Sequence, residues 1–530
     1  MSVFVWFKRD LRLSDHAAVH AARVAAPGEP LRGLYIAEPG LWAQPDAAAQ
    51  HWDFVRESLL DLGVALRAAG GRLHVATGEA TATLERAWQA QPFDTLLSHE
   101  ETGNDFTFQR DRAVARWCRD RGVHWQEWPQ FGVVRRLPDR DHWHGQWQAF
   151  MSAPAWPSPA EQDLSEASAQ GERARLAGAL PTARDLGLTQ PLPAARQRGG
   201  RQAALAVLHD FLDERCGQYR GGISSPLSAP TACSRLSAYL AHGCVGAREV
   251  VQATVARMAE LEALGTPDAK RQRAGLSAFL SRMHWHCHFI QKLESEPELE
   301  WRNLHRGYDG LREGEFNAVH FEALKQGRTG WPMVDACVAM LRHTGWVNFR
   351  MRAMLVSVAS YPLWLHWRPV GEWLATQFLD YEPGIHWSQM QMQAGTTGIN
   401  TTRVYNPIKQ AHDHDPHGHF VRRWLPAMRR VPQAWLFEPW QMPPELQASL
   451  GLRVGRDAEA DIPLPWVDLA EATRTAKSRV HGLRAQPEVK AAKAEIVRKH
   501  GSRTFRGGQR PDRRGRQAPP GPTDQLSLEF

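Results

Sequence analysis

The sequence predicts an α/β N-terminal domain with a doubly wound parallel sheet, followed by a second domain that is all-α. Short apolar runs alternate with helical patterns over residues 1–130, as in a parallel sheet whose two faces are covered by helices. Strand patterns almost vanish after Gln202, where long segments with an apolar period near 3.6 residues follow. A length of 530 residues also fits two or more domains.

The first domain, residues 1–130, should contain five strands with helices between them. We expect strands at residues 3–7, 31–36, 72–75, 95–98 and 123–125, and helices at residues 16–25, 54–69, 81–90 and 108–119. No GxGxxG follows the first strand and no Walker loop occurs. The sequence therefore predicts no dinucleotide or triphosphate site of the standard types in this domain.

The rest of the chain divides into three parts. Residues 131–200 are predicted to be an irregular interdomain linker, because seven prolines interrupt any long helix. Residues 201–470 should form the helical domain, with helices at residues 203–215, 234–242, 247–261, 276–293, 334–343 and 348–361. We expect residues 471–530 to be a disordered basic tail, because GGQRPDRRGRQAPPGP at 507–522 has too few apolar groups to offset the entropy of ordering its backbone.

The excess positive charge belongs to this tail. The formal net charge is +7, but residues 471–530 hold 14 Lys and Arg against 6 Asp and Glu, so the remainder of the chain is near −1. A cationic arm would attract nucleic acid weakly and in a salt-dependent way. A specific site on the near-neutral body would need a local cluster of cations.

Cysteine usage and hydropathy indicate the compartment. The six cysteines have no CxxC spacing and none follows Cys337, so neither a disulfide framework nor a four-Cys iron–sulfur site is predicted in the C-terminal half. Lys8, Arg9 and Asp10 interrupt the apolar start of the chain, and no window approaches 18 uncharged apolar residues. We expect a protein of a reducing compartment that is neither exported nor inserted in a membrane.

Two segments could carry chemistry on their own. Ser234, Arg235 and Ser237 fall on the opening turn of a predicted helix, where backbone N–H groups favour an anion such as pyrophosphate, although an ordinary serine cap explains the same pattern. His284 and His288 have the i, i+4 spacing of helical zinc pairs. No carboxylate adjoins them, so we interpret them as pocket-lining residues and assign no metal site.

A third region is denser in functional groups. Residues 329–335, 344–352 and 378–382 combine tryptophans with Arg350, Arg352, Asp380 and Glu382. An Arg–carboxylate pair among aromatic rings can hold a planar, redox-active ring such as a flavin. A tryptophan-rich core with solvated ion pairs is the alternative interpretation, since the chain has 22 tryptophans.

Five motifs occur in a characteristic order: VWFKRDLRLSD at 5–15, SRLS at 234–237, TGWP at 329–332, TGW at 344–346 and YNP at 405–407. In this order and at these spacings they resemble the DNA photolyase/cryptochrome family, over roughly residues 1–445. The resemblance implies an N-terminal antenna domain and a C-terminal FAD-binding domain. It also implies that excited, fully reduced FAD passes an electron to a pyrimidine dimer flipped out of UV-damaged DNA and recovers it after the dimer splits.

The resemblance assigns roles by position in the motifs. Arg352 and Asp380 would form an ion pair beside the flavin ring, Glu382 would lie near the ring edge, and His386 near the position that faces N5. Trp285 would stack on the flipped lesion, because an extruded base needs an aromatic plane. The other expected cofactor-binding residues are Tyr219, Cys233, Ser234, Arg235, Leu236, Ser237, Phe279 and His286, and the expected DNA-binding residues are Arg282, Trp285, Asn348, Phe349, Arg350 and Arg403.

The chain departs from the family pattern at several positions. Cys233 replaces the Thr or Ser that is more often found there, at the loss of one hydroxyl. Arg282 replaces the glutamate of many dimer-specific photolyases, and arginine donates only as a cation. Asn348 occupies the place of a histidine found in relatives that repair six–four lesions. Neither standard lesion is therefore predicted residue for residue.

The family's chain of electron-transferring tryptophans is also altered. Trp367 occupies the middle place, but the flavin-proximal place falls on Met390 and the terminal place near Gly314. Trp387 lies three residues before Met390, so it could face the same side of a helix and substitute for it. With Trp285, Arg282 and Asn348, these residues complete the candidate catalytic set.

We expect a light-driven, photolyase-like DNA repair enzyme that acts on UV-damaged DNA as a cytoplasmic, nucleoid-associated monomer. A cryptochrome-type photoreceptor without repair activity is the alternative, and a metal-dependent nucleic-acid hydrolase using His284, His286 and His288 would require a colourless protein. SHEETGND at 98–105 ends a strand at the ligand-binding edge of the sheet. It is the predicted rim of a site for a second chromophore of folate, deazaflavin or lumazine type.

Overall fold

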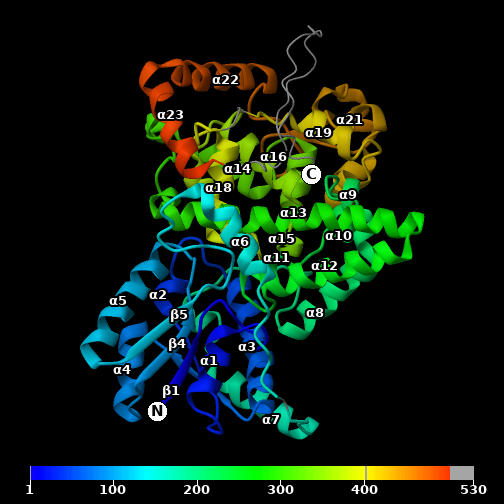
Figure 1. The fold of residues 1–530 in the computed structure, drawn as a ribbon. Coiled ribbons are helices and arrows are strands. Elements are labelled where there is room, and N and C mark those ends of the chain that lie inside the picture. The colour runs from blue at the N-terminus through cyan, green and yellow to red at the C-terminus, as the bar shows by residue number, and fades with distance from the viewer. Residues whose placement is uncertain (1, 161, 400–402, 502–530) are drawn as a thin grey trace.

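The protein has two parts, a sheet domain and a larger helical domain that lies above it in Figure 1. The structure, a computed structural model, describes residues 2–160, 162–399 and 403–501. In these residues both predicted classes of domain are present, so the predicted fold class is confirmed.

Five parallel strands form the sheet, in the order β3-β2-β1-β4-β5. The strands are β1 (Val3–Phe7), β2 (Arg32–Ala37), β3 (Arg72–Thr77), β4 (Thr95–His99) and β5 (His124–Trp128). Val5 of β1 is level with Gly33 of β2 on one side and with Leu97 of β4 on the other. The strand order reverses between β1 and β4, which places the expected ligand crevice at the carboxyl ends of these two strands.

Alternation along β1 explains why helices cover both faces of the sheet. Val3, Val5 and Phe7 pack with α1 (Ala17–Ala25) and α3 (Ala49–Ala68), whereas Phe4 and Trp6 pack with α4 (Ala80–Ala90) and α5 (Asp105–Arg121). Successive side chains of a strand point to opposite faces. An all-apolar strand such as VFVWF therefore needs an apolar layer on each side.

The segment predicted to be an irregular linker, residues 131–200, contains two helices, so this part of the prediction is wrong. They are α6 (Trp143–Ser152) and α7 (Glu166–Ala179). Leu176 of α7 packs so closely on α3 that a Cβ at Gly63 would lie 2.0 Å from its Cδ1. The prolines lie outside these two helices, and tertiary burial stabilises each short helix between them.

The helical domain is organised around α13 (Pro267–Ser295), a 29-residue helix that packs against α9, α12 and α18. The largest apolar cluster of this domain surrounds α15 (Pro332–Thr344) and α16 (Phe349–Ser360), and it buries Trp331, Trp367 and Trp387. The remaining elements are α2 (Pro39–Trp42), α8 (Arg201–Asp210), a π-helix (Phe211–Arg215), α9 (Cys216–Gly222), α10 (Ala229–Ala232), α11 (Ser237–Ala241), α12 (Ala247–Leu264), α14 (Ala318–Gln326), α15 (Pro332–Thr344), α16 (Phe349–Ser360), α17 (Trp367–Gln377), α18 (Pro383–Ala394), α19 (Pro407–His414), α20 (His419–Trp424) and α21 (Pro444–Ser449), with a short pair β6 (Val454–Gly455) and β7 (Ile462–Pro463).

The prediction of a disordered tail from residue 471 is wrong as far as residue 500. α22 (Leu469–Ala485) and α23 (Pro487–His500) form a helical pair across the top and left of Figure 1. α23 is attached to α13 through Glu296, which accepts hydrogen bonds from Lys499 Nζ at 2.7 Å and His500 Nε2 at 2.8 Å. Residues 502–530, which complete the predicted tail, lie outside the described residues.

Arg9, just after β1, connects the two domains. Its guanidinium donates to Ala241 O at 2.9 Å, to Tyr381 O at 3.2 Å and to Glu382 Oε2 at 2.9 Å. A partly buried charge that bonds to three groups across an interface fixes the relative position of both sides. Among the described residues, none of the helices combines the length and apolarity that a membrane span requires.

Candidate active site

The main cavity of the helical domain has a volume of about 310 Å³ and lies between α13, α16, α18 and the segment 233–237. It brings together most of the residues that the motifs had indicated. The predicted residues that line it are Tyr219, Cys233, Ser234, Arg235, Ser237, Phe279, Arg282, Trp285, His286, Phe349, Arg352, Asp380, Glu382, His386 and Met390.

The segment 233–237 precedes a helix instead of opening one. α11 has five residues and begins at Ser237, and Arg235 has a left-handed backbone with φ +63°. The expected pyrophosphate-binding helix turn at Ser234 is therefore wrong, because this backbone conformation interrupts the helix. Arg215 fixes this segment by donating hydrogen bonds to the carbonyls of Thr231 at 3.0 Å and Ser234 at 3.3 Å.

Arg235 brings a positive charge into the cavity wall. Its guanidinium lies 3.8 Å from the centroid of the Trp346 ring, and Nη1 is buried without a hydrogen-bond partner among the described residues. Burial lowers the pKa of Arg235 to about 10, although Asp380 acts in the opposite direction. A buried cation in this state favours an anionic or hydrogen-bond-accepting ligand.

The predicted ion pair forms at the cavity wall. Arg352 Nη2 donates to Asp380 Oδ2 at 2.9 Å, and the side chain of Asp380 is 5% exposed. Burial would raise the pKa of Asp380, but Arg352 and a hydrogen bond from Ser237 lower it below its ordinary value. The Arg352 guanidinium also lies 4.2 Å from the centroid of the Phe378 ring. The pair therefore presents a fixed cation and a fixed carboxylate next to aromatic surface.

Glu382 and His386 are both buried at this wall. Burial raises the pKa of Glu382 to about 7 against the opposing effect of Arg9, so this carboxyl can hold a proton near neutral pH. His386 Nε2 lies 2.9 Å from Gly371 O, and since a carbonyl only accepts, Nε2 carries the hydrogen. Burial lowers the pKa of His386 to about 3, so the ring is neutral and Nδ1 is its acceptor atom.

One face of α13 supplies the aromatic side of the cavity. Trp285 is half-buried and stacks on Phe289, with ring centroids 5.7 Å apart and an angle of 28°. Arg282, one turn earlier, hydrogen-bonds the hydroxyl of Tyr219. The predicted stacking residue and the arginine that replaces the family's glutamate therefore lie on the same cavity wall.

Several predicted residues do not line the cavity. The side chain of Leu236 is fully buried in the apolar core, so its contact with a cofactor stays a prediction that only its backbone could fulfil. Asn348 is 1% exposed and donates to the carbonyls of Ile223 at 3.0 Å and Ser224 at 2.9 Å, so its predicted role in direct DNA contact is wrong. Its amide instead holds the segment after α9 against the start of α16.

Two of the predicted DNA-binding arginines, Arg350 and Arg403, lie outside the cavity lining. Arg350 is half-buried on α16 and acts electrostatically on His414, while Arg403 is exposed after α18. Neither lines the cavity, so their contact with DNA stays a prediction.

Two tryptophans lie behind the cavity wall. The rings of Trp367 and Trp387 are buried with centroids 6.0 Å apart at an angle of 70°. Met390 lines the cavity, but a thioether is not an aromatic relay. Trp367 Nε1 donates to Asn303 Oδ1 at 2.7 Å, which fixes its ring. Gly314, the predicted terminal position, lies in an exposed 3₁₀ turn.

The histidines of α13 have separate partners. His284 Nε2 lies 3.1 Å from His144 Nδ1, His288 is bonded to the Arg140 guanidinium, and His286 lines the cavity. Arg140 next to His288 disfavours the binding of a metal cation there.

Another cluster of potential metal ligands occurs in the sheet domain, where Asp10 Oδ2 lies 2.9 Å from His16 Nε2 and 2.9 Å from His99 Nδ1. His16 Nδ1 accepts from Val19 N, which leaves the hydrogen on the Nε2 atom that faces Asp10.

A second cavity, of about 100 Å³, lies at the carboxyl ends of β1, β2 and β4. Glu101, Gly103 and Asn104 of the predicted rim line it, together with Glu38 and Arg110. Arg110 bridges Glu38 at 2.9 Å and Glu101 at 2.5 Å in the buried wall. The predicted edge of the sheet therefore carries a cavity, and the class of second chromophore stays a prediction.

Some functional side chains were not predicted. Trp346, Phe378, Phe289 and Tyr381 line the main cavity, and Tyr381 also lines the second one. Trp346 and Phe378 lie inside the quoted motifs, but a motif does not indicate which ring faces a cavity. Arg9 was only part of the N-terminal motif, and its bonds to Tyr381 and Glu382 depend on how the domains meet.

The donor set of the main cavity fits FAD. Arg235 Nη1 and Glu382 Oε1 are buried without hydrogen-bond partners among the described residues. The Ser234 and Ser237 hydroxyls, the Arg352–Asp380 pair and the Trp346 and Phe378 rings line the same space. A cofactor with phosphates, hydroxyls and a planar heterocycle would satisfy these groups.

Two family models match the chain: "DNA photolyase" over residues 3–134 and "FAD binding domain of DNA photolyase" over residues 279–482. Together they cover more than half of the sequence, and they match the sheet domain and the cavity-bearing helices respectively. The two models and the two structural domains therefore agree in order and position.

Whole-chain comparisons give the same result. A deoxyribodipyrimidine photo-lyase of Agrobacterium fabrum is 28% identical over 492 residues, with 89% of this chain and 96% of that protein covered. A cryptochrome DASH of Gloeobacter violaceus is 27% identical over 503 residues, with 89% and 94% covered. The solved structure of a bacterial class III photolyase from Agrobacterium tumefaciens has a TM-score of 0.73 at 25% identity and covers 91% of this chain and 98% of its own. Taken with the geometry of the cavity, these matches show that the chain belongs to the DNA photolyase/cryptochrome family.

Proposed function

We propose that this protein is a light-driven DNA repair flavoprotein that splits UV-induced pyrimidine dimers by electron transfer from reduced FAD. The observation that carries the proposal is the placement of Trp285 and the Arg352–Asp380 pair on the walls of one cavity. A lesion stacked on Trp285 would share that cavity with the flavin ring, so an electron would have only a short distance to travel. FAD supplies the photoexcited electron when it is bound and reduced.

The protein's own residues would bind and orient both partners. Arg235, Ser234 and Ser237 would hold the polar chain of FAD, and Arg352 with Asp380 would orient the ring edge. Glu382, with its pKa raised to about 7, would hold a proton at the ring edge, and neutral His386 would accept a hydrogen bond. Trp367 and Trp387 would return electrons to the oxidised cofactor from the protein side.

The DNA side of the proposal rests on α13. Trp285 would stack on the extruded lesion, and Arg282 would donate to it as a cation. We propose UV-damaged DNA as the partner, a monomer as the active form, and the nucleoid as the place of action. We also propose that the second cavity holds an antenna pigment of folate, deazaflavin or lumazine type, next to Glu38 and Glu101.

Defined substrates test the proposal. Oligonucleotides with one cyclobutane dimer or one six–four lesion, single- and double-stranded, would be incubated with the FAD-loaded protein under blue light and in the dark. Light-dependent restoration of at least one lesion is expected. Bound FAD without restoration of any lesion would favour the cryptochrome-type photoreceptor, and a colourless protein that cleaves DNA in the dark with added metal would favour the hydrolase.

A further inference from the structure

The junction of the two C-terminal helices contains a basic cleft that the proposed repair reaction does not use. His481 and Arg484 lie one turn apart on α22, and Lys490 and Lys493 lie one turn apart on α23. All four line a cavity of about 390 Å³, together with Tyr308 and His305. The described residues that line it include no carboxylate. We call His481, Arg484, Lys490 and Lys493 the basic cleft.

The cations of this cleft differ from two others on the same helices. Arg479 is paired with Glu315 at 2.6 Å, and Lys499 with Glu296 at 2.7 Å. Arg484, Lys490 and Lys493 form no ion pair with any carboxylate in the described part of the chain. Like charges gathered without a counter-charge repel one another, and an anion between them removes that cost.

The lining of the basic cleft also contains neutral hydrogen-bond donors. Tyr308 is 2% exposed and lines the cleft, where the charge of Arg484 acts on its hydroxyl. α23 begins at Pro487, and Gln486 before it provides no side-chain cap, so first-turn N–H groups lack a capping side chain. The start of a 14-residue helix favours negative charge. His305 Nε2 donates to Val489 O at 2.8 Å and so fixes the first turn of α23 against the lining of the cleft.

We propose that the basic cleft is a phosphate-binding site that holds the backbone of the damaged DNA away from the lesion. This inference rests on the proposed function, because it assumes that DNA is the substrate. The cleft offers cations, N–H groups and one hydroxyl, all of which suit phosphate oxygens. Phosphate contacts of this kind fix the position of DNA and carry no sequence information, so we expect binding that is independent of sequence.

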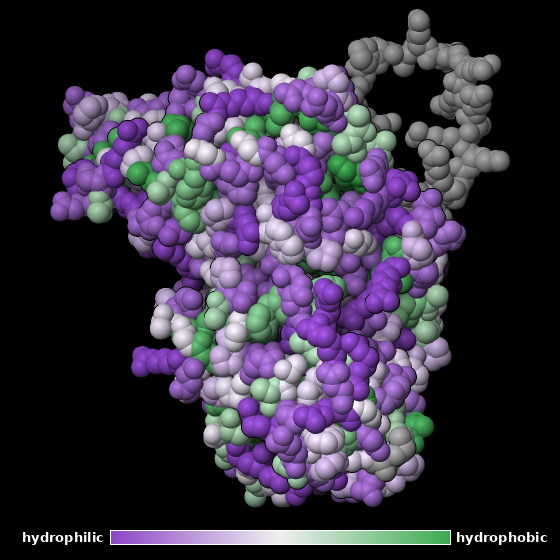
Figure 2. Space-filling view, turned by 90° about the vertical axis from the view of Figure 1, so that its left-hand side faces the viewer, coloured by the Kyte–Doolittle hydropathy of each residue, from purple (hydrophilic) through white to green (hydrophobic). Residues whose placement is uncertain are grey.

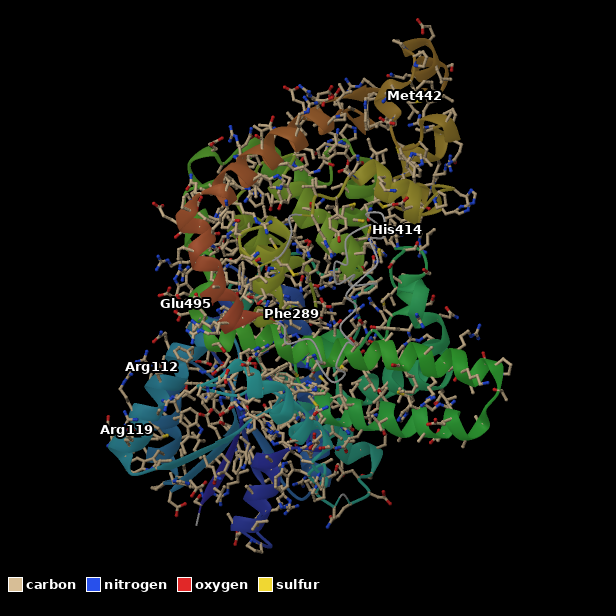
Figure 3. The ribbon with its side chains drawn as sticks, turned by 45° about the horizontal axis from the view of Figure 1, so that its top comes forward. Arg112, Arg119, Phe289, His414, Met442 and Glu495 are labelled. Carbon is tan, nitrogen blue, oxygen red and sulfur yellow. The ribbon has the colours of Figure 1, made fainter. Side chains whose placement is uncertain are left out.

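Its position suits a DNA strand that leaves the lesion cavity. The far end of α23 contacts α13 at Glu296, and α13 also carries Trp285. The rise along the two helices from the cleft to Trp285 is about 36 Å, and the spacing between packed helix axes adds about 10 Å, so the two sites are at most about 46 Å apart, within about one and a half turns of duplex. Figure 3 shows Glu495 of α23 at the left edge of the molecule and Phe289 of α13 further in at about the same height, and the side of the molecule that α23 covers is largely hydrophilic in Figure 2. Residues 469–500 hold eight Lys and Arg against three Asp and Glu.

The test compares two variants that lose the same charge. Lys490→Gln/Lys493→Gln removes the two exposed cations of the cleft, and Arg474→Gln/Lys477→Gln removes two cations of α22 outside it. Binding of FAD-loaded full-length protein to lesion-bearing and intact duplex would be measured by fluorescence anisotropy at four salt concentrations. The cleft variant should bind both duplexes about tenfold more weakly, with a slope of log K against log salt reduced by about 2, and the control slope should change by less than about 0.5.

Equal slopes for the two variants would overturn the proposal, since the effect would then be one of net charge. A second measurement separates DNA from free phosphate. Inorganic phosphate would be added at ionic strength matched with chloride, and the unfolding temperature recorded. Stabilisation of wild type but not of the cleft variant, combined with unchanged DNA slopes, would assign the cleft to a free anion and overturn the DNA assignment. Lesion repair at saturating DNA tests the proposed function separately, because it does not depend on this site.

Discussion

Tyr381 Oη donates a 2.5 Å hydrogen bond to Asp46 Oδ2, so one phenol joins the helical domain to the sheet domain. The same side chain lines both cavities. Asp46 also accepts from Asn104 Nδ2 at 3.1 Å, and Asn104 caps α5. Loss of this hydrogen bond would therefore disturb both the cavity expected to hold the antenna pigment and the cavity wall expected to contact the flavin.

Removal of the carboxylate at position 380 should empty the flavin site. Asp380→Ala leaves Arg352 unpaired at a wall where the carboxylate is 5% exposed. Breaking a buried pair costs about 3–5 kcal/mol, less here because Arg352 is partly exposed. We expect at least a tenfold loss of FAD per protein, measured from the 450 nm absorbance and from FAD released on denaturation. Asp380→Asn, whose side chain has the same size as the aspartate, is the matched control. An Asp380→Ala protein with full FAD content would contradict the assignment of Asp380 to the flavin site.

Light-driven reduction of oxidised FAD should depend on two tryptophans. The rings of Trp367 and Trp387 are 6.0 Å apart, and phenylalanine in place of either is much harder to oxidise. Trp367→Phe should slow photoreduction at least tenfold, and Trp387→Phe should slow it more than Met390→Leu does. The rate would be followed at 450 nm under blue light with an external donor. A strong defect in Met390→Leu beside a normal Trp387→Phe would show that the relay runs elsewhere.

The aromatic plane on α13 should decide lesion preference. Trp285→Ala removes a stacking surface worth roughly 1–3 kcal/mol per base, which corresponds to a loss of about 5- to 150-fold in preference for damaged over intact duplex. General DNA binding should remain, because its cations are elsewhere. Anisotropy titrations with both duplexes provide the measurement. Retained preference together with retained repair would exclude Trp285 as the stacking residue.

Truncation after residue 501 should have the opposite effect. Residues 502–530 contain six arginines against three carboxylates, so their removal should weaken binding to all DNA and flatten its salt dependence. The preference for damaged DNA should stay within about twofold of wild type. The truncation leaves α22 and α23 intact, whereas a cut at residue 470 would remove both helices. Loss of lesion preference in this truncated protein would place part of the lesion site in the tail.

Glu382 should make stability depend on pH. Its pKa is raised to about 7 by burial, so the folded state keeps a proton that the unfolded chain releases near its ordinary value of 4.5. The stabilisation is fully present below about pH 4.5 and is lost as pH rises through 7. Relative to wild type, Glu382→Gln should therefore gain up to about 3 kcal/mol between pH 4.5 and 8. Urea unfolding at several pH values measures this gain, and the exposed Glu495→Gln is the control that should show none.

The sequence alone determined the sheet domain in some detail. Every predicted strand from residue 3 to residue 125 overlaps a strand of the structure, because buried parallel strands are short, apolar and separated by amphipathic helices. The family motifs also located most of the cavity. Arg352, Asp380 and Trp285 are distant in sequence, and the matching motifs alone indicated that they share a site.

Only the tertiary structure decided the rest. Asn348 had the position of a DNA-contacting residue, but the amide bonds the carbonyls of Ile223 and Ser224, and no pattern in the sequence brings those segments together. The helices of residues 143–152, 166–179, 469–485 and 487–500 were missed because proline content and charge suggested irregular chain. They are stabilised by the burial of Met151, Leu176, Ala476, Val480 and Val489 against other elements. Local propensity is a weak term, and apolar contacts between distant segments outweigh it. The basic cleft also depends on tertiary structure, since the sequence shows a run of cations and only the turn at Gln486 brings Arg484, Lys490 and Lys493 around one cavity.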